Sequence, residues 1–206
     1  METKSDELAL KRREEIINAC EKLYGTMTFK DITIKEIGKE TSFSRTSIYN
    51  YFQTKEEIFL ALMKREYEKW IDSLDEIYSK NDILIGNELA SLIAHSLEER
   101  HNLLKLLSMN LYDIEENSSI ERLVDFKKCY KTAILSLGNI VDKFCKYMDE
   151  EEKHDFIYSF LPFMFGIYPY VYITDKQKTA METAGIDFPQ PTVYELAYKF
   201  LEKFLK

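Results

Sequence analysis

Residues 41–59 concentrate side chains that can donate hydrogen bonds. The segment reads TSFSRTSIYNYFQTKEEIF and holds several hydroxyl residues, two tyrosines and the cations Arg45 and Lys55. Two of its apolar residues, Ile48 and Phe52, are four positions apart, a spacing that places both side chains on the same face of a helix. The other face would present mainly donors, which suits a partner rich in hydrogen-bond acceptors.

Capping residues around this segment predict two short helices joined by a turn. A capping box that begins at Thr33 predicts a short helix to about Glu40. Ser44 is a suitable N-cap for a second helix, Arg45–Phe52, and a capping box at Thr54 opens a longer one. Two short helices joined by about four residues are typical of a helix-turn-helix, whose second helix offers its N-terminal residues to base edges in the major groove of DNA.

The charge distribution permits a polyanionic partner although the chain as a whole is acidic. The net charge is −8 at pH 7, and repulsion from such a chain would slow and weaken its encounter with DNA. Residues 33–55, however, hold four Lys/Arg and two Asp/Glu, a local excess of positive charge. We therefore expect this window to make the contact with double-stranded DNA.

Residues 31–62, DITIKEIGKETSFSRTSIYNYFQTKEEIFLAL, resemble the DNA-binding domain of TetR-family transcriptional regulators. The shared features are a Thr-capped helix, a turn, a recognition helix that ends in Tyr-x-Tyr/His-Phe, and a Lys that opens the fourth helix. The resemblance covers roughly residues 10–62. It implies that bases are read by Arg45, Thr46 and Ser47, and that phosphates are contacted by Thr33, Ser44, Tyr49, Tyr51 and Lys55.

The resemblance also implies a domain organisation and a function. It implies a three-helix DNA-binding domain in residues 1–54 and a helical domain for ligand binding and dimerisation in residues 55–206. A member of this family is a ligand-responsive regulator, most often a repressor, that leaves a palindromic operator when a small molecule binds. One residue departs from the pattern, because the family often has Gly in the turn where this chain has Ser42. If the turn needed a positive φ there, a non-Gly residue would cost about 1 kcal/mol.

The rest of the chain predicts an all-α fold with about nine main helices. Helix formers dominate, and there are only six Gly and four Pro. One segment, residues 102–114, reads as a single helix. The final helix, expected from about Pro191 to Leu205, carries a broad apolar stripe, and together with the aromatic segment before it this stripe predicts a homodimer interface. The predicted interface residues are Phe160, Val193, Leu196, Ala197, Phe200, Leu201 and Phe204.

The segment Phe156–Ile173 contains no charged residue and is rich in aromatic side chains. Its length is at the lower bound for a transmembrane helix, but it contains Pro162, Gly166 and Pro169 and has acidic flanks, so we expect no membrane insertion. We expect this helix to be buried on every side, in the helical bundle or in a subunit interface, and to form one wall of a cavity for an apolar or aromatic effector. The predicted cavity residues are Trp70, Met109, Tyr112, Phe126, Tyr130, Phe163 and Tyr168.

Motifs for catalysis or cofactor binding were not found in the sequence. The three histidines lack zinc-like spacing, there is no glycine-rich phosphate loop, and the three cysteines form no disulfide framework. The prediction is therefore a non-enzymatic protein without metal or cofactor. The charged N-terminus resembles no secretory signal, which favours the cytoplasm. A helical-bundle enzyme and a membrane-associated helical protein are the alternatives that this reasoning leaves.

Overall fold

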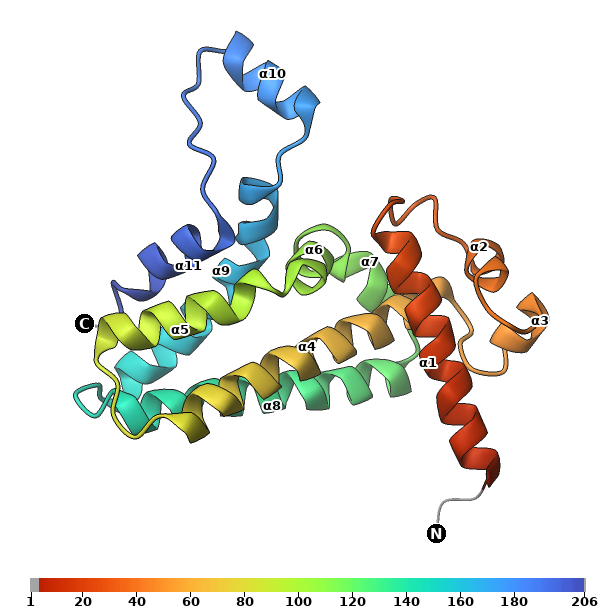
Figure 1. Cartoon of the computed structure of the whole chain (residues 1–206), viewed down its shortest axis with the longest axis horizontal. Helices are drawn as coiled ribbons and strands as arrows, with labels where there is room; N and C mark the ends of the chain where they lie inside the picture. Colours follow the sequence, from red (N-terminus) through yellow and green to blue (C-terminus); the bar gives the residue numbers. More distant parts are fainter. Residues whose placement is uncertain (1–3, 206) are drawn as a thin grey trace. The chain divides into compact units, whose positions relative to one another are not determined.

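The computed structural model describes residues 4–205, and within them it is all helical, which confirms the predicted fold class (Figure 1). The described part has eleven α-helices, where the sequence predicted about nine. They are α1 (Lys4–Tyr24), α2 (Ile34–Lys39), α3 (Arg45–Ile48), α4 (Lys55–Lys80), α5 (Gly86–Glu98), α6 (His101–Met109), α7 (Leu111–Glu116), α8 (Ile120–Phe144), α9 (Glu150–Val171), α10 (Asp175–Thr183) and α11 (Val193–Leu201).

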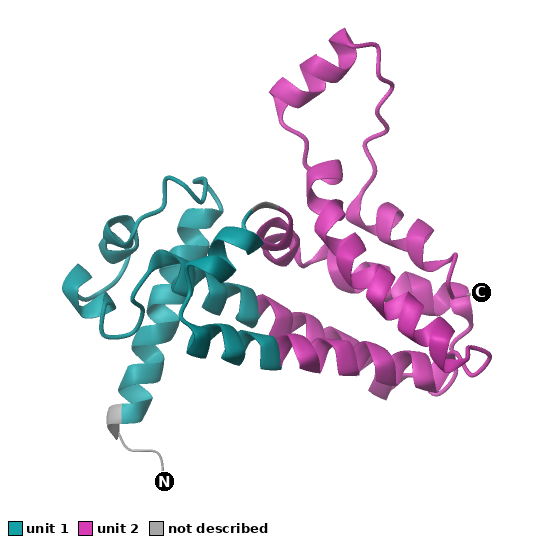
Figure 2. Ribbon diagram, turned by 180° about the vertical axis from the view of Figure 1, so that it is seen from behind, with its two compact units in different colours: residues 1–65, 110–128 teal, residues 66–109, 129–206 magenta. Residues whose placement is uncertain are grey.

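The chain forms two compact units, shown in different colours in Figure 2. Unit 1 comprises Met1–Arg65 with Asn110–Lys128, and unit 2 comprises Glu66–Met109 with Cys129–Lys206. The long helices α4 and α8 each contribute residues to both units. Unit 1 therefore contains the whole segment predicted to bind DNA, and it adds the start of α8, which is distant in sequence.

Each unit buries apolar side chains that recur at helical spacing. In unit 1, Tyr24 meets Phe59 edge to face, with 5.1 Å between the ring centroids, and the side chains buried with them include Ile16, Cys20, Ile37, Ile48, Phe52 and Ile58. In unit 2, the fully buried Trp70 donates from Nε1 to Ser96 Oγ at 3.0 Å. That bond satisfies the one polar atom of the Trp70 side chain, so this bulky residue can occupy the core.

Several helix boundaries differ from those expected from the sequence. Helix α3 ends at Ile48 instead of Phe52, because the chain then closes through turn bonds such as Tyr51 N to Ile48 O at 2.8 Å. The helix predicted over residues 102–114 is broken at Asn110, whose backbone is non-helical and whose Oδ1 accepts a hydrogen bond from Tyr24 at 2.8 Å.

The uncharged segment lies in α9, and only one of its faces is buried in the subunit. Phe156, Phe160 and Met164 are fully buried, whereas Tyr158 and Tyr170 are 57% and 59% exposed. One subunit alone therefore covers one face of this helix, and the expected burial of its other side would need a subunit interface. Within residues 4–205, no single helix has the length and hydropathy to cross a membrane; α9 and α10 reach those limits only as a pair, which is bent by 82°.

Candidate nucleic-acid interface

Helices α2 and α3 pack closely because a glycine lies where they meet. A Cβ on Gly38 would lie 3.3 Å from both Cα and Cβ of Arg45 and 3.5 Å from Cδ1 of Ile48. The side chains of Ile37 and Ile48 are fully buried beneath this contact. The apolar residues thus hold the two helices together, as expected for a helix-turn-helix, and direct the polar side of α3 outward.

The turn between α2 and α3 is held by a residue of α1. The backbone N–H of Ser42 donates to the Glu15 carboxylate, and Ser42 Oγ donates to Glu15 Oε2 at 3.1 Å. No non-glycine residue in the described part of the chain has a positive φ. Ser42 is therefore not strained, and the cost considered for a non-glycine residue in this turn does not arise.

Four of the predicted DNA contacts lie together at the start of α3. Arg45 and Thr46 are exposed, and Ser44 Oγ lies 3.0 Å from Ser47 Oγ. Ser44 occupies the N-cap position, but its side chain makes no capping bond to the backbone. The Arg45 guanidinium donates from Nη2 to Tyr49 Oη at 3.4 Å, so a fifth predicted contact joins the same surface.

The other predicted contacts have partners within the protein. Thr33 is exposed, and its hydroxyl bonds to the Glu36 carboxylate while it accepts from Glu36 N at 3.3 Å. Hydrogen bonds from Thr33 and Lys39 hold the pKa of Glu36 at about 2, so this carboxylate stays ionised at physiological pH. Lys55 Nζ donates to two backbone carbonyls, Phe29 O at 2.7 Å and Ile32 O at 3.2 Å. The same ammonium lies 4.2 Å from the centroid of the Phe29 ring.

The start of α8 contacts the segment that follows α3. The sequence did not predict this contact. Arg122 donates from Nη2 to Tyr51 O at 2.9 Å, and its guanidinium carbon lies 5.6 Å from the centroid of the Phe52 ring. From α1, Arg13 lies 5.0 Å from the same centroid. Burial and the charge of Arg122 lower the pKa of Arg13. No local motif marks Arg122, because it is 71 residues from Tyr51 in sequence.

Glu57 makes a second link to the start of α8. Its carboxylate is buried, and it accepts from Gln53 N at 2.8 Å and from Ser119 N at 3.3 Å. Thr54 Oγ1 accepts from Glu57 N at 3.1 Å and donates to Asn117 O at 3.1 Å. Burial alone would raise the pKa of Glu57, but the donors from Gln53 and Ser119 outweigh it and hold the pKa below its ordinary value.

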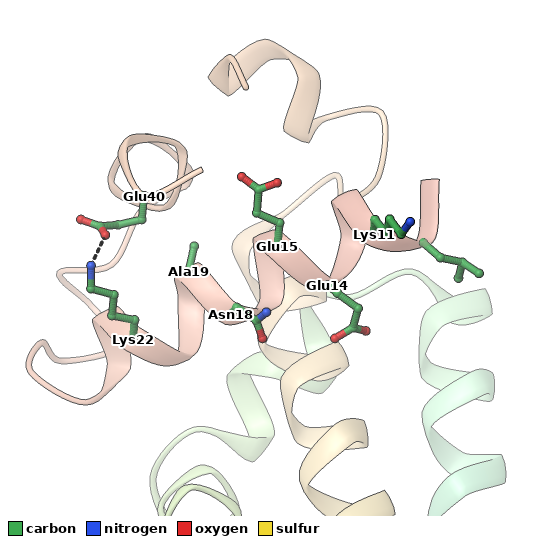
Figure 3. A pocket seen from close by; sticks show the side chains of 8 residues that line it. Lys11, Glu14, Glu15, Asn18, Ala19, Lys22 and Glu40 are labelled. Atoms are coloured by element: carbon green, nitrogen blue, oxygen red, sulfur yellow. Dashed lines mark hydrogen bonds and ion pairs between the residues drawn. The ribbon is translucent and has the colours of Figure 1, made fainter. Parts of the chain in front are cut away.

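A surface groove also occurs in unit 1, between α1 and the end of α2 (Figure 3). Its volume is about 490 Å³, and an ion pair of 2.5 Å between Lys22 and Glu40 crosses one end. The groove has both cations and carboxylates along its walls: Lys11, Lys22, Glu14, Glu15 and Glu40. Such mixed charge does not favour DNA.

Family comparisons match nearly the whole chain in two consecutive parts. The family described as "Bacterial regulatory proteins, tetR family" matches residues 16–62, and the one described as "Tetracyclin repressor-like, C-terminal domain" matches residues 64–206. The chain belongs to the TetR family. The resemblance of residues 31–62 to this family is thereby confirmed, and TetR-family proteins are DNA-binding transcriptional regulators that are typically non-enzymatic.

Individual relatives of this TetR-family chain are distant. The uncharacterized HTH-type transcriptional regulator YfiR of Bacillus subtilis (strain 168) is 30% identical over 66 residues, and the match spans 32% of each protein. The fatty acid degradation regulator FadR from Bacillus halodurans has a TM-score of 0.61 at 13% identity, with 94% of each chain covered. FadR from Bacillus subtilis in complex with stearoyl-CoA has a TM-score of 0.56 at 17% identity, covering 94% of this chain and 97% of that one. At such identities these structures show the fold alone.

The predicted effector contacts of this TetR-family chain are divided between the two units. Trp70, Tyr130, Phe163 and Tyr168 belong to unit 2, whereas Tyr112 and Phe126 belong to unit 1. Tyr112 is 78% exposed and Phe126 is buried. The side chain of Met109 lies outside the described part. Burial and the nearby Tyr172 raise the pKa of Tyr168.

A small open surface pocket in unit 2 includes a hydrogen-bond partner of one of these residues. Its volume is about 230 Å³, and it is lined by α4 and α5. Its lining includes Ser96, the hydrogen-bond partner of Trp70, but none of the predicted effector contacts. Among the described residues, no group of three or more His, Cys, Asp or Glu side chains is placed to hold a metal ion.

The predicted dimer contacts of the TetR-family chain fall into two sets. The side chains buried in the subunit's own core are Phe160, Val193, Ala197 and Leu201, so they are not available to a partner. The half-buried ones are Leu196, Phe200 and Phe204. Helix α11 packs on α5 and α9, and Phe163 of α9 stacks on Phe200 with 4.1 Å between ring centroids.

Proposed function

We propose that this chain is a homodimeric repressor that binds a palindromic operator in double-stranded DNA and releases it when a small apolar or aromatic molecule binds. In this proposal residues 1–54 contact DNA, and residues 55–206 bind the effector and dimerise. The protein would act in the cytoplasm, where the operator is accessible. Membership of the TetR family supports transcriptional regulation. The repressor role, the palindromic operator, the apolar effector and the homodimer are our proposal.

The exposed donors at the start of α3 carry the DNA-binding part of the proposal. Arg45 and Thr46 project from a helix that is fixed from behind by Gly38 and Ile48. A fixed arginine can donate two hydrogen bonds to O6 and N7 of guanine in the major groove. Selection of duplexes from a random pool by the wild-type protein tests this: enrichment of an inverted repeat is expected, and enrichment of no sequence would refute it.

The faces of α9 and α11 support a two-fold dimer. Tyr158 and Tyr170 are exposed on an uncharged stretch of α9, and Phe200 and Phe204 on α11 are only half-buried. Apolar patches of this kind usually mark an interface, because an isolated monomer exposes few of them. A two-fold interface would also place two recognition helices about one DNA turn, roughly 34 Å, apart. Light scattering at micromolar concentration tests it, and a monomer would refute it.

The aromatic side chains of unit 2 support an apolar or aromatic effector. Tyr67 lies between Trp70 and Tyr130, with ring-centroid distances of 6.2 and 5.7 Å. The effector must prefer the conformation that binds DNA poorly, and a coupling of about 1–3 kcal/mol would lower operator affinity some 5- to 150-fold. Helix α4 is suited to carry the change because it is continuous from Lys55 to Lys80. Thermal-shift screening, followed by operator release, tests this part, and hits confined to highly charged phosphorylated compounds would contradict it.

A further inference from the structure

A cation of α1 lies beside the segment that follows the recognition helix. Arg12 Nη1 is 3.5 Å from Tyr51 Oη, and the Arg12 guanidinium carbon lies 5.6 Å from the centroid of the Phe43 ring. The contact thus joins α1 to both segments that flank α3, since Phe43 precedes it and Tyr51 follows it. The Arg12 side chain is half-buried, so the aromatic ring restricts where the guanidinium can go.

Among the side chains that the structure describes, no carboxylate forms an ion pair with Arg12. Glu15, three positions further along α1, is already bonded to the backbone and side chain of Ser42. Lys11 differs from Arg12, because its ammonium pairs with Glu7 at 2.7 Å. Arg12 is therefore a partly fixed cation, without a counter-ion among the described side chains, beside the residues that flank α3.

The guanidinium also keeps most of its hydrogen-bonding capacity. An arginine has five N–H donors in a planar fork that matches the oxygens of a phosphate. The long contact to Tyr51 engages one of them. Because the Tyr51 oxygen accepts in that contact, its own O–H remains able to donate. Two donors of different residues can therefore converge on one anionic group, and Arg12 loses little freedom on binding because its side chain is already restricted.

We propose that Arg12 binds a backbone phosphate of the operator duplex together with the Tyr51 hydroxyl, so that the DNA contact extends from the helix-turn-helix to α1. This inference rests on the proposed DNA-binding function. Arg12 touches the residues on either side of α3 and not those of its first turn. Its charge therefore lies at the edge of the reading surface, where phosphate contacts position the protein without reading sequence.

The test compares Arg12→Met with Lys11→Met in the full-length protein. Methionine keeps the apolar stem of either side chain and removes its charge, and Lys11 is the matched control because it is adjacent and already paired. Affinity is measured by fluorescence anisotropy over a range of salt concentrations. The probes are a duplex selected from a random pool by the wild-type protein and a scrambled duplex of the same length. Thermal unfolding of each variant checks the fold, and Arg12→Lys serves as a second variant that keeps the charge.

Arg12→Met is expected to weaken binding to both duplexes by a similar factor, roughly tenfold at low salt. The slope of log affinity against log salt should fall by about 1, while Arg12→Lys keeps the wild-type slope and Lys11→Met changes little. Wild-type affinity and slope for Arg12→Met would overturn the phosphate contact and leave the proposed function intact. A change in sequence preference alone would overturn it as well, because a phosphate carries no sequence information. Failure of the wild-type protein to bind either duplex would instead refute the DNA-binding function itself.

Discussion

Replacing Glu57 with Gln should weaken the link between the recognition segment and the start of α8. The Glu57 carboxylate is only 4% exposed, and its two oxygens accept from Gln53 N at 2.8 Å and Ser119 N at 3.3 Å. Glutamine has the same shape but only one acceptor oxygen. One of the two backbone N–H groups would then face an amide NH₂ and lose its partner in a buried place.

The expected loss in the free energy of unfolding follows from these two hydrogen bonds. A hydrogen bond to a charged group contributes about 1.5–3 kcal/mol, and a buried donor left without a partner costs about 1–3 kcal/mol. We therefore expect Glu57→Gln to lower the free energy of unfolding by about 2 kcal/mol. For a chain of this length that corresponds to a fall in Tm of roughly 4–8 °C. Glu56→Gln is the matched control, since it makes the same change one position away on the more accessible side of α4.

The pH dependence gives a second, independent readout. The pKa of Glu57 is lower in the folded protein than in the unfolded chain, so its ionised form stabilises the fold. This contribution is fully present above the ordinary Glu pKa of about 4.3 and is lost as the pH falls through the lowered folded pKa. The stability difference between wild type and Glu57→Gln should therefore narrow as the solution becomes more acidic than about pH 4.

Chemical denaturation at several pH values measures the stability difference between wild type and Glu57→Gln and how this difference changes with pH. Equal stability of wild type and Glu57→Gln at neutral pH would refute the role of these two hydrogen bonds. A large stability difference that stayed constant at acidic pH would show that the amide disturbs packing and that the loss of charge is not the cause. A loss of equal size in Glu56→Gln would show that any neutralisation near the start of α4 has this effect.

Four further variants test the surface around α3 and the interface. Arg45→Ala should cost about 1–3 kcal/mol of affinity for the selected duplex, measured by anisotropy, with unchanged thermal unfolding. Gly38→Ala should force α2 and α3 apart by a few tenths of an ångström and weaken operator binding in the same assay, since its Cβ would meet the Arg45 backbone. Lys55→Ala should lower stability by about 1–3 kcal/mol in denaturant titrations, because two carbonyls lose a charged donor. Changing Phe200 and Phe204 together to Glu should give monomers by light scattering that no longer bind the operator.

Local sequence determined the helical fold and the location of the helix-turn-helix. Helix capping and apolar periodicity act between residues three or four positions apart, so they can be read directly from the chain. Thr33 and Thr54 accept from the backbone N–H three residues on, and Ile48 and Phe52 are buried, as predicted. The return bond of each predicted capping box is not formed, because the Glu36 carboxylate bonds the Thr33 hydroxyl and the Glu57 carboxylate bonds Gln53 N and Ser119 N. The family pattern in residues 31–62 depends on the same short-range spacing, which is why it was recognised from the sequence.

The interactions that hold this element in place depend on residues far apart in the chain. Ser42 is held by Glu15 across 27 positions, Lys55 by the Phe29 carbonyl across 26, and Tyr51 by Arg122 across 71. No propensity or spacing rule reaches so far, because such contacts arise only when separate helices pack.

Tertiary structure also decided which apolar side chains are available to a partner. The stripe on α11 looks continuous in sequence, yet α5 and α9 cover Val193, Ala197 and Leu201 and leave Phe200 and Phe204 half-buried. The apolar stripe indicates which side chains avoid water. It does not indicate whether the same subunit or a partner covers them. Likewise, an aromatic residue such as Tyr112 reads as a cavity wall in sequence and is 78% exposed in the structure. Hydrophobicity is a property of the residue, whereas burial depends on the helices that pack around it.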